Sequence, residues 1–368
     1  MTFTFPNLSR DNSNFYAPRF EIEIENDRIT ANLSKQIIDL TVEEKIDEGA
    51  SFTMTVNDQY DRGEEKFQWM DHELFQVGNR ISIKVGYENN LLPMIIGNIT
   101  GLEPSFFRGE APTLTVKGQD LSYNYMKKIS PERTFVERSY SEIAKIIADE
   151  AGLMIVVENT EQFEGQKRKN SNESYFSFLH RLAGEVDREF KIKGQTIYFV
   201  QPGDDETEIL TLELGRDIIR FNPNLSTASL YSEVEVRGHN PRNPREPIVG
   251  RATAGSERSR ESGRQTGSQI AAGRSESSER PRRVITDIIV NSVDHANSIA
   301  LAELNRASDG LIEGDGECIG IPHIRTGVNI RLEKMGERFS GKYYVKGTTH
   351  TINNSGYRTR FRVKRNAL

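Results

Sequence analysis

Cysteine is almost absent from the sequence, since Cys318 is the only one among 368 residues. One cysteine excludes an internal disulfide, and a structural zinc site needs several cysteine or histidine ligands. The six histidines are scattered without ligand-like spacing. Neither His180, on a predicted helix, nor His350, in a predicted strand, has a visible acid or nucleophile partner. We therefore expect no metal and no cofactor, and a chain made in a reducing cytoplasm.

Long apolar runs are also missing. No stretch approaches the roughly 20 apolar residues of a membrane-spanning helix. The segment from Met1 to Arg10 lacks the basic and then apolar order of a secretion signal. A net charge of −6 argues against general affinity for nucleic acid. These features predict no membrane insertion by this chain and no nucleic-acid recognition.

Enzyme signatures are missing as well. The sequence has no glycine-rich phosphate loop, no His-Glu-x-x-His pair and no Gly-x-Ser-x-Gly elbow. The run Gly314-Asp315-Gly316-Glu317 lacks the alternating oxygen ligands of a calcium loop, so we expect a turn there. Acidic residues are numerous enough to leave a carboxylate pair for glycoside cleavage open, but no motif points to one. We expect a protein that is not an enzyme.

Alternating strands and glycines dominate what the sequence does contain. Residues 327–364 show three alternating strands, and residues 78–117 repeat their plan. In both stretches a glycine opens the first strand, the second strand carries a glycine, and the third ends in Val-Lys. Alternation of apolar and polar residues is typical of a strand with one buried face. The positions that carry the pattern are Gly78, Ile81, Gly97 and Val116 in the early copy, and Gly327, Ile330, Gly341, Tyr343 and Val363 in the late copy.

This repeat has two interpretations. The glycines either permit turns and bulges in two unrelated sheets, or they mark a duplicated barrel whose strand ends form a ring contact. Gly78 and Gly97 are 19 positions apart whereas Gly327 and Gly341 are 14 apart, which places any insertion in a loop, where it costs little. The duplication predicts a mainly β protein with two similar antiparallel β-barrel (tube-like) domains and a small α/β middle domain.

The middle of the chain has a different, α+β texture. Ser139 and Glu142 have the spacing of a helix capping box, and Gly152 supplies a stop. A short buried strand follows at 153–157, a second helix at about 173–183, and a hairpin at 190–200. These elements predict a small domain inserted between the two β regions.

The segment 251–283 is rich in arginine and serine and contains no aromatic residue. Such a stretch buries too little surface to offset its ordering entropy, so we expect a flexible surface loop. The alternative is a basic strap that orders against an acidic face of a partner. After it, Asp294 is expected to cap a helix.

Six regions are therefore expected along the chain. The first is either a frayed end or an arm that reaches a neighbouring subunit. The regions are an N-terminal arm (1–19), a first β-barrel (20–125), a small α+β domain (126–205), connecting strands (206–250), the Arg/Ser-rich loop (251–283) and a second β-barrel with its leading helix (284–368).

The late copy resembles the C-terminal part of the phage late control protein D family. The motifs are Gly-x-x-x-Gly-x-Pro at 316–322, Phe-Ser-Gly-x-Tyr-Tyr-Val at 339–345, and His350 followed by Gly356-Tyr357. The runs 175–183 and 234–238 resemble the family's middle helix and the segment before its second barrel. Together these similarities span roughly residues 20–365. Relatives of this kind are baseplate hubs of contractile tails, the hub half of VgrG proteins and hubs of extracellular injection systems.

The resemblance implies a structural baseplate hub, not an enzyme. Such a hub is a homotrimer that joins the hexameric inner tube protein to a trimeric spike and continues the channel. Because Leu368 follows the late copy directly, we expect the spike to be a separate spike protein. Baseplate wedge proteins or cargo are further expected partners. The chain would be made in the cytoplasm and become part of a phage tail or injection particle. A free-standing β-rich binding module and a hub-associated peptidoglycan hydrolase are the alternatives.

Overall fold

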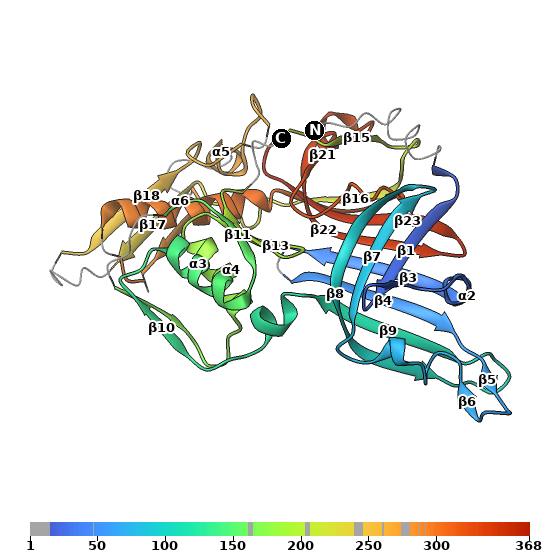
Figure 1. Ribbon diagram of the computed structural model, residues 1–368. Coiled ribbons are helices and arrows are strands. Elements are labelled where there is room, and N and C mark those ends of the chain that lie inside the picture. The colour runs from blue at the N-terminus through green and yellow to red at the C-terminus, as the bar shows by residue number, and fades with distance from the viewer. Residues whose placement is uncertain are drawn as a thin grey trace.

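The computed structural model describes residues 15–46, 48–160, 165–202, 207–238, 246–259, 261–273, 280–286, 288–290 and 292–368. Most of the expected N-terminal arm (1–19) lies outside these ranges. The described chain forms one large, mainly antiparallel sheet with smaller α/β units beside it (Figure 1). None of its helices is long and apolar enough to cross a membrane.

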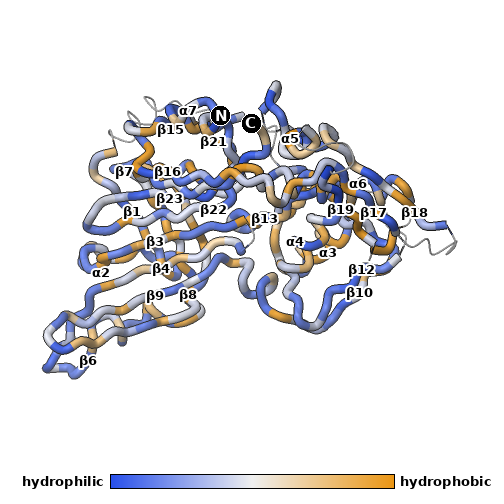
Figure 2. The backbone as a smooth tube through the Cα atoms, turned by 180° about the vertical axis from the view of Figure 1, so that it is seen from behind, coloured by the Kyte–Doolittle hydropathy of each residue, from blue (hydrophilic) through white to orange (hydrophobic). Residues whose placement is uncertain are grey.

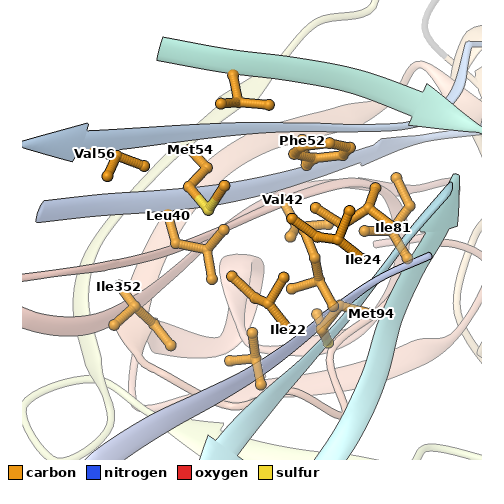
Figure 3. Packing of buried hydrophobic residues seen from close by; sticks show 14 of the residues in the cluster. Ile22, Ile24, Leu40, Val42, Phe52, Met54, Val56, Ile81, Met94 and Ile352 are labelled. Atoms are coloured by element: carbon orange, nitrogen blue, oxygen red, sulfur yellow. The ribbon is translucent and has the colours of Figure 1, made fainter. Parts of the chain in front are cut away.

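The first half of the sheet follows the alternating sequence of residues 18–120. Inward-facing side chains such as Ile22, Leu40, Val42 and Met54 are fully buried and pack together between the strands (Figure 3). The elements of this half are β1 (Pro18–Ile24), β2 (Asp27–Arg28), α2 (Ala31–Gln36), β3 (Ile37–Lys45), β4 (Gly49–Asn57), β5 (Tyr60–Asp61), β6 (Lys66–Phe67), η2 (Glu73–Phe75), β7 (Arg80–Tyr87), β8 (Asn90–Ser105) and β9 (Thr113–Asp120).

The second half is built from two separated stretches of the chain and has its own core, which includes Leu212, Ile330 and Val363. Gly314–Glu317 lies inside one of its strands, so the expected turn there is wrong. The elements of this half are β15 (Leu210–Glu213), β16 (Ile218–Leu225), β20 (Ile312–Ile319), β21 (Asn329–Glu333), α7 (Gly336–Phe339), β22 (Gly341–Asn353) and β23 (Gly356–Arg365).

Strand β22 joins the two halves because it pairs with β3. The resulting order is β16-β20-β23-β22-β3-β4-β9-β8-β7-β1-β2, and β21 and β15 continue from β22, giving 13 strands. The mainly β class with an α+β insertion is confirmed. The two expected barrels are two curved halves of this one sheet, and the described strand pairs close neither of them. The edge of β3 that would close the first half is instead taken by β22.

The middle domain has the expected helices and hairpin. Ser139 and Glu142 form the capping box, and Gly152 ends the helix with φ of +65°. Strand β11 is not buried as expected, because it is an edge strand that leaves Met154 and Val156 exposed. The elements are η3 (Tyr123–Lys127), β10 (Arg133–Val136), α3 (Tyr140–Ala151), β11 (Met154–Val157), β12 (Gln166–Lys169), α4 (Tyr175–Glu185), β13 (Glu189–Lys193) and β14 (Thr196–Val200).

A third unit occupies the region expected to hold connecting strands and a flexible loop. A long helix packs on a three-stranded sheet and buries Val234, Val236 and Leu304. Its N-cap is Ser292, which accepts from the His295 amide, and not Asp294. The elements are β17 (Glu233–Gly238), β18 (Ile248–Thr253), α5 (Gly267–Gly273), β19 (Arg282–Ile285) and α6 (Val293–Asp309).

The described part of the Arg/Ser-rich segment is ordered by polar contacts. Glu257, only 6% exposed, accepts hydrogen bonds from the hydroxyls of Thr266 and Ser268 and from the Gly255 amide at 2.9 Å. The expectation of a structureless loop is therefore wrong for residues 251–259 and 261–273. Hydrogen bonds to a buried carboxylate therefore order this segment, whereas the packing of apolar side chains orders other parts of the chain. Residues 260 and 274–279 lie outside the described chain.

Removing this carboxylate tests the ordering of the segment. Glu257→Ala removes the acceptor of two hydroxyls, those of Thr266 and Ser268, and of the Gly255 and Ser268 amides, at a cost of about 2 kcal/mol. We expect trypsin to cut the native protein between residues 251 and 274 more than about tenfold faster, because cleavage follows local opening. Glu246→Ala, at an exposed position, is the matched control. Equal cleavage rates for the two variants would contradict this account.

Candidate assembly surface

The two halves of the sheet open with the same local hydrogen bonds. The Gly78 amide donates to the Ile99 carbonyl at 2.8 Å, and the Gly327 amide donates to the Val345 carbonyl at the same distance. Both glycines have positive φ, +102° and +73°. Because this region of backbone space disfavours side chains, glycine is required at both places. The two glycines occupy equivalent positions.

The registers of the two halves also agree strand by strand. In the first half the strand order is β7, β8, β9, β4 and β3. In the second half it is β21, β22, β23, β20 and β16. The β8–β9 pair is bulged between Ile99 and Gly101, and β22–β23 between Val345 and Gly347. The outer pairs β3–β4 and β16–β20 are bulged after Ile37 and Ile218 respectively. Each bulge adds one residue at a set place, so these five strands follow one plan in both halves. The next strands differ, because β1 pairs antiparallel with β7 whereas β15 pairs parallel with β21.

This common register places the early signature positions. Ile81 lies opposite Gly97, and Ile330 lies opposite Tyr343, so Ile81 corresponds to Ile330. Gly97 therefore corresponds to Tyr343 and not to Gly341, as the sequence pattern had it. Gly97 is packed against the β9 backbone, where a Cβ atom would lie 2.0 Å from the Gln119 carbonyl.

The third strands are also mismatched by two residues, but in the opposite direction, because Val116 corresponds to Phe361. Val116 lies opposite Leu102, and Phe361 lies opposite Thr348, the residue that corresponds to Leu102. Val363 therefore does not correspond to Val116, although both precede a lysine. The β7–β8 connection and the β21–β22 connection differ in length, and the residue pattern alone could not locate that difference.

The joint between the halves is a ladder of seven residue pairs, from Gly347–Lys45 to Asn353–Asp39. The hydroxyls of Thr41 and Thr351 are hydrogen-bonded across it at 3.1 Å. Ile352 and Tyr357 come from the second half but belong to the core of the first. The joint is therefore held by apolar burial as well as by backbone hydrogen bonds.

An ion pair at the end of the joint connects residues that are far apart in the chain. Arg325 donates to the Glu44 carboxylate with two nitrogens and to the Pro93 and Met94 carbonyls at 2.9 and 2.7 Å. Burial raises the pKa of Glu44, but the hydrogen bond and charge of Arg325 outweigh this effect and hold that pKa below its usual value. One side chain thus fixes β3, β8 and the loop before β21.

His350 lies behind the same joint and is 1% exposed. Its Nε2 lies 2.9 Å from the Ile324 carbonyl, which can only accept, so Nδ1 is left to accept from Tyr357, 2.8 Å away. Burial, with the nearby charge of Arg325, lowers the pKa of His350 to about 4. Nothing in the sequence indicated these partners of His350.

The face of the sheet opposite the core is polar and its charges are paired. Lys117 contacts Glu103 at 2.6 Å on the first half, and Arg362 contacts Asp315 at 3.0 Å on the second. Along the strands, hydrophilic and hydrophobic positions alternate in Figure 2, as this two-faced sheet requires. The wide outer face therefore carries charge of both signs.

A charged cleft of about 680 Å³ lies between α4, β13 and α6. Its Asp187 carboxylate accepts from Arg258 and from Asn305, at 2.9 and 2.8 Å. Burial raises the pKa of Asp187. Nowhere in the described ranges do three His, Cys, Asp or Glu side chains gather to hold a metal ion. Through its hydrogen bond with Asn305, Asp187 connects the middle domain to α6.

Breaking the Arg325–Glu44 pair tests the joint. Arg325→Leu leaves a buried carboxylate without its partner, and we expect a loss of about 2–3 kcal/mol in the free energy of unfolding. This loss is smaller than that expected for a fully buried ion pair, because 26% of the Arg325 side chain remains exposed. Lys117→Leu, in an exposed pair, should cost no more than about 1 kcal/mol. Urea unfolding measures both, and similar losses would contradict the role of the pair.

The lowered pKa of His350 predicts an acid-sensitive joint. Between about pH 6.5 and 4 the unfolded chain binds a proton that folded His350 does not, so stability falls as the pH falls. The contribution is up to about 1.4 kcal/mol per pH unit. His350→Gln should flatten this part of the stability profile measured by urea unfolding, whereas His180→Gln, on the exposed side of α4, should not. An unchanged slope in His350→Gln would overturn the assignment.

Comparison with solved structures gives the same fold along almost the whole chain. The 43 kDa tail protein of prophage MuSo2 from Shewanella oneidensis is 13% identical with a TM-score of 0.69, and the match covers 95% of this chain and 98% of that one. The E. coli c3393 protein, described as a type VI secretion component similar to T4 tail proteins gp27 and gp5, is 11% identical with a TM-score of 0.58, covering 93% and 76%. A chain of the Francisella PdpA–VgrG complex is 11% identical with a TM-score of 0.57, covering 98% and 61%.

At these identities the likeness establishes the fold. The neighbours themselves are tail and secretion-system proteins. No curated protein matches the sequence of the chain. The family described as the Alg8 N-terminal domain matches residues 16–354, which is nearly all of the sequence. The chain therefore belongs to the Alg8 N-terminal domain family.

Proposed function

We propose that this chain is the structural hub of a contractile injection machine, as its resemblance to the phage late control protein D family implies. It acts as a trimer that joins the hexameric inner tube to the trimeric spike and continues the channel between them. Baseplate wedge proteins or cargo are further partners. The chain is made in the cytoplasm, performs no catalysis and becomes part of the finished particle.

One observation carries this proposal: the two halves share one strand plan and lie side by side in one sheet. Three copies of such a chain present six near-equivalent sheet units. A ring of three chains can therefore meet a sixfold ring on one side and a threefold spike on the other. The paired charges on the outer face suit a wall that contacts water along a channel.

The solved structures of similar fold support the same assignment. They are a prophage tail protein, a type VI secretion component and a chain of a VgrG complex. A hub role accounts for the two similar halves of the sheet, which an isolated binding module would not require.

Capturing the tagged chain from the cells that make it tests this function. We expect electron microscopy of the captured material to show sheathed tubes, with the tag at the end of the tube that carries the spike. Light scattering of the purified chain should give three times the 41.8 kDa mass of one copy. Recovery of the chain without tubes, as a particle of 41.8 kDa, would contradict the proposal.

A further inference from the structure

Two of the open strand edges in the part of the chain that the structure describes have counterparts in the internal joint. One is the edge of β16 that faces away from β20, which is open after Ile218, where Leu214 forms an isolated bridge. The other is the edge of Gly101–Ser105 in β8 that faces away from β9, because β8 pairs with β7 only up to Asn98. In the shared register, β16 is the counterpart of β3, and Gly101–Ser105 is the counterpart of Gly347–Thr351. These counterparts are the strands that form the internal joint.

Apolar side chains at the open edges are exposed where their counterparts in the joint are buried. Phe106 corresponds to Ile352 and is 59% exposed, whereas Ile352 is 8% exposed inside the core of the neighbouring half. On the other edge, Phe221 corresponds to Leu40, which is 1% exposed, but Phe221 remains only half-buried. Both edges therefore expose apolar surface that a neighbouring sheet covers at the joint.

We propose that a second copy of this chain supplies that neighbour, and that β16 of one copy pairs antiparallel with the end of β8 of the next in the register of the internal joint. This inference rests on the proposed function and names the surface through which the hub assembles. Phe106 of one copy enters the second-half core of the next, as Ile352 enters the core of the first half. The cross-copy pairs are Leu102–Leu225, Glu103–Asn224, Pro104–Pro223, Ser105–Asn222 and Phe106–Phe221.

The prolines fit this register. In the joint, the Ile46 amide bonds to the Lys346 carbonyl, and alternation along the ladder makes His350–Val42 another hydrogen-bonded pair. Pro104 and Pro223 take these two places and lack amide hydrogens. A proline on an open edge discourages pairing with arbitrary strands. Because both prolines fall in one pair, that pair forms neither of its two hydrogen bonds, and the hydrogen-bonded pairs on either side of it, Leu102–Leu225 and Phe106–Phe221, keep theirs.

The β5–β6 hairpin holds Phe106 in place for this contact. The Phe67 ring lies 5.4 Å from the Phe106 ring and 4.9 Å from that of Tyr60. Figure 1 shows this hairpin projecting past the end of the sheet, beside the end of β8. The aromatic cluster is thus presented at the edge where the next copy is expected.

Cysteine cross-linking in captured particles tests the register. Glu103 and Asn224 correspond to Thr349 and Glu43, a non-hydrogen-bonded pair whose Cα atoms lie about 4.5 Å apart, which suits a disulfide. The native Cys318 is buried. Glu103→Cys with Asn224→Cys should give, on oxidation, covalent dimers and trimers and nothing larger. Glu103→Cys with Asn222→Cys, displaced by two residues, should give at least about tenfold less product.

The outcomes distinguish a failure of this interface from a failure of the proposed hub function. Particles that contain the double-cysteine chain but show no cross-linked product, or equal product in the displaced variant, overturn the interface and leave the hub intact. Absence of the chain from every particle, wild type included, overturns the hub itself.

A second measurement tests the interface without the cysteine variants, in case they do not fold. Phe106→Asp should convert the trimer to monomers in light scattering, whereas Phe107→Asp, at the adjacent exposed position, should leave the trimer in place. Retention of the trimer by folded Phe106→Asp overturns the interface.

Discussion

The pairing of β3 with β22 is the interaction on which the rest of the sheet depends. It converts two sheets, each with an open edge, into one continuous layer, and it places the Ile352 side chain of one half in the core of the other. Burying an isoleucine of this kind stabilises a fold by about 2 kcal/mol. The Arg325–Glu44 pair and the His350 cluster occupy the same place. The relative position of the two halves is therefore fixed by apolar, ionic and hydrogen-bonding contacts together.

A fixed joint has a geometric consequence for assembly. When two similar units are related by one rotation within a chain, the open edges at the ends of that chain repeat the surfaces of the joint. A contact of this head-to-tail kind closes into a ring if the rotation allows it and continues as a filament if it does not. The internal joint would then be the template for every joint in the ring. Proline at both open edges limits pairing with strands that do not match them.

Much of the local structure could be predicted from the sequence, but few of the contacts between distant parts of the chain could. Alternation at Ile22 and Ile24 and the Ser139–Glu142 capping box could be predicted, because neighbouring residues determine them. Gly78 and Gly327 could be matched because a positive φ restricts both positions to glycine. Gly97 and Gly341 were matched wrongly, since bulges and loop lengths set the register and leave no clear mark in the residue pattern.

Long-range contacts were beyond prediction from one sequence. Glu44 and Arg325 are 281 positions apart, and no local pattern relates one to the other. The Glu257 cluster was missed for another reason. Low apolar content was taken to mean disorder, whereas a buried carboxylate with several donors orders that segment. Polar networks of this type depend on geometry that composition does not record.

A density map of the assembled ring tests the central claim most directly. The account predicts six sheet units at one radius around a single bore, with first and second halves alternating and with the same strand pairing at every joint. A map in which the first halves and the second halves form separate rings, or in which the open edges of β8 and β16 face solvent, would contradict it.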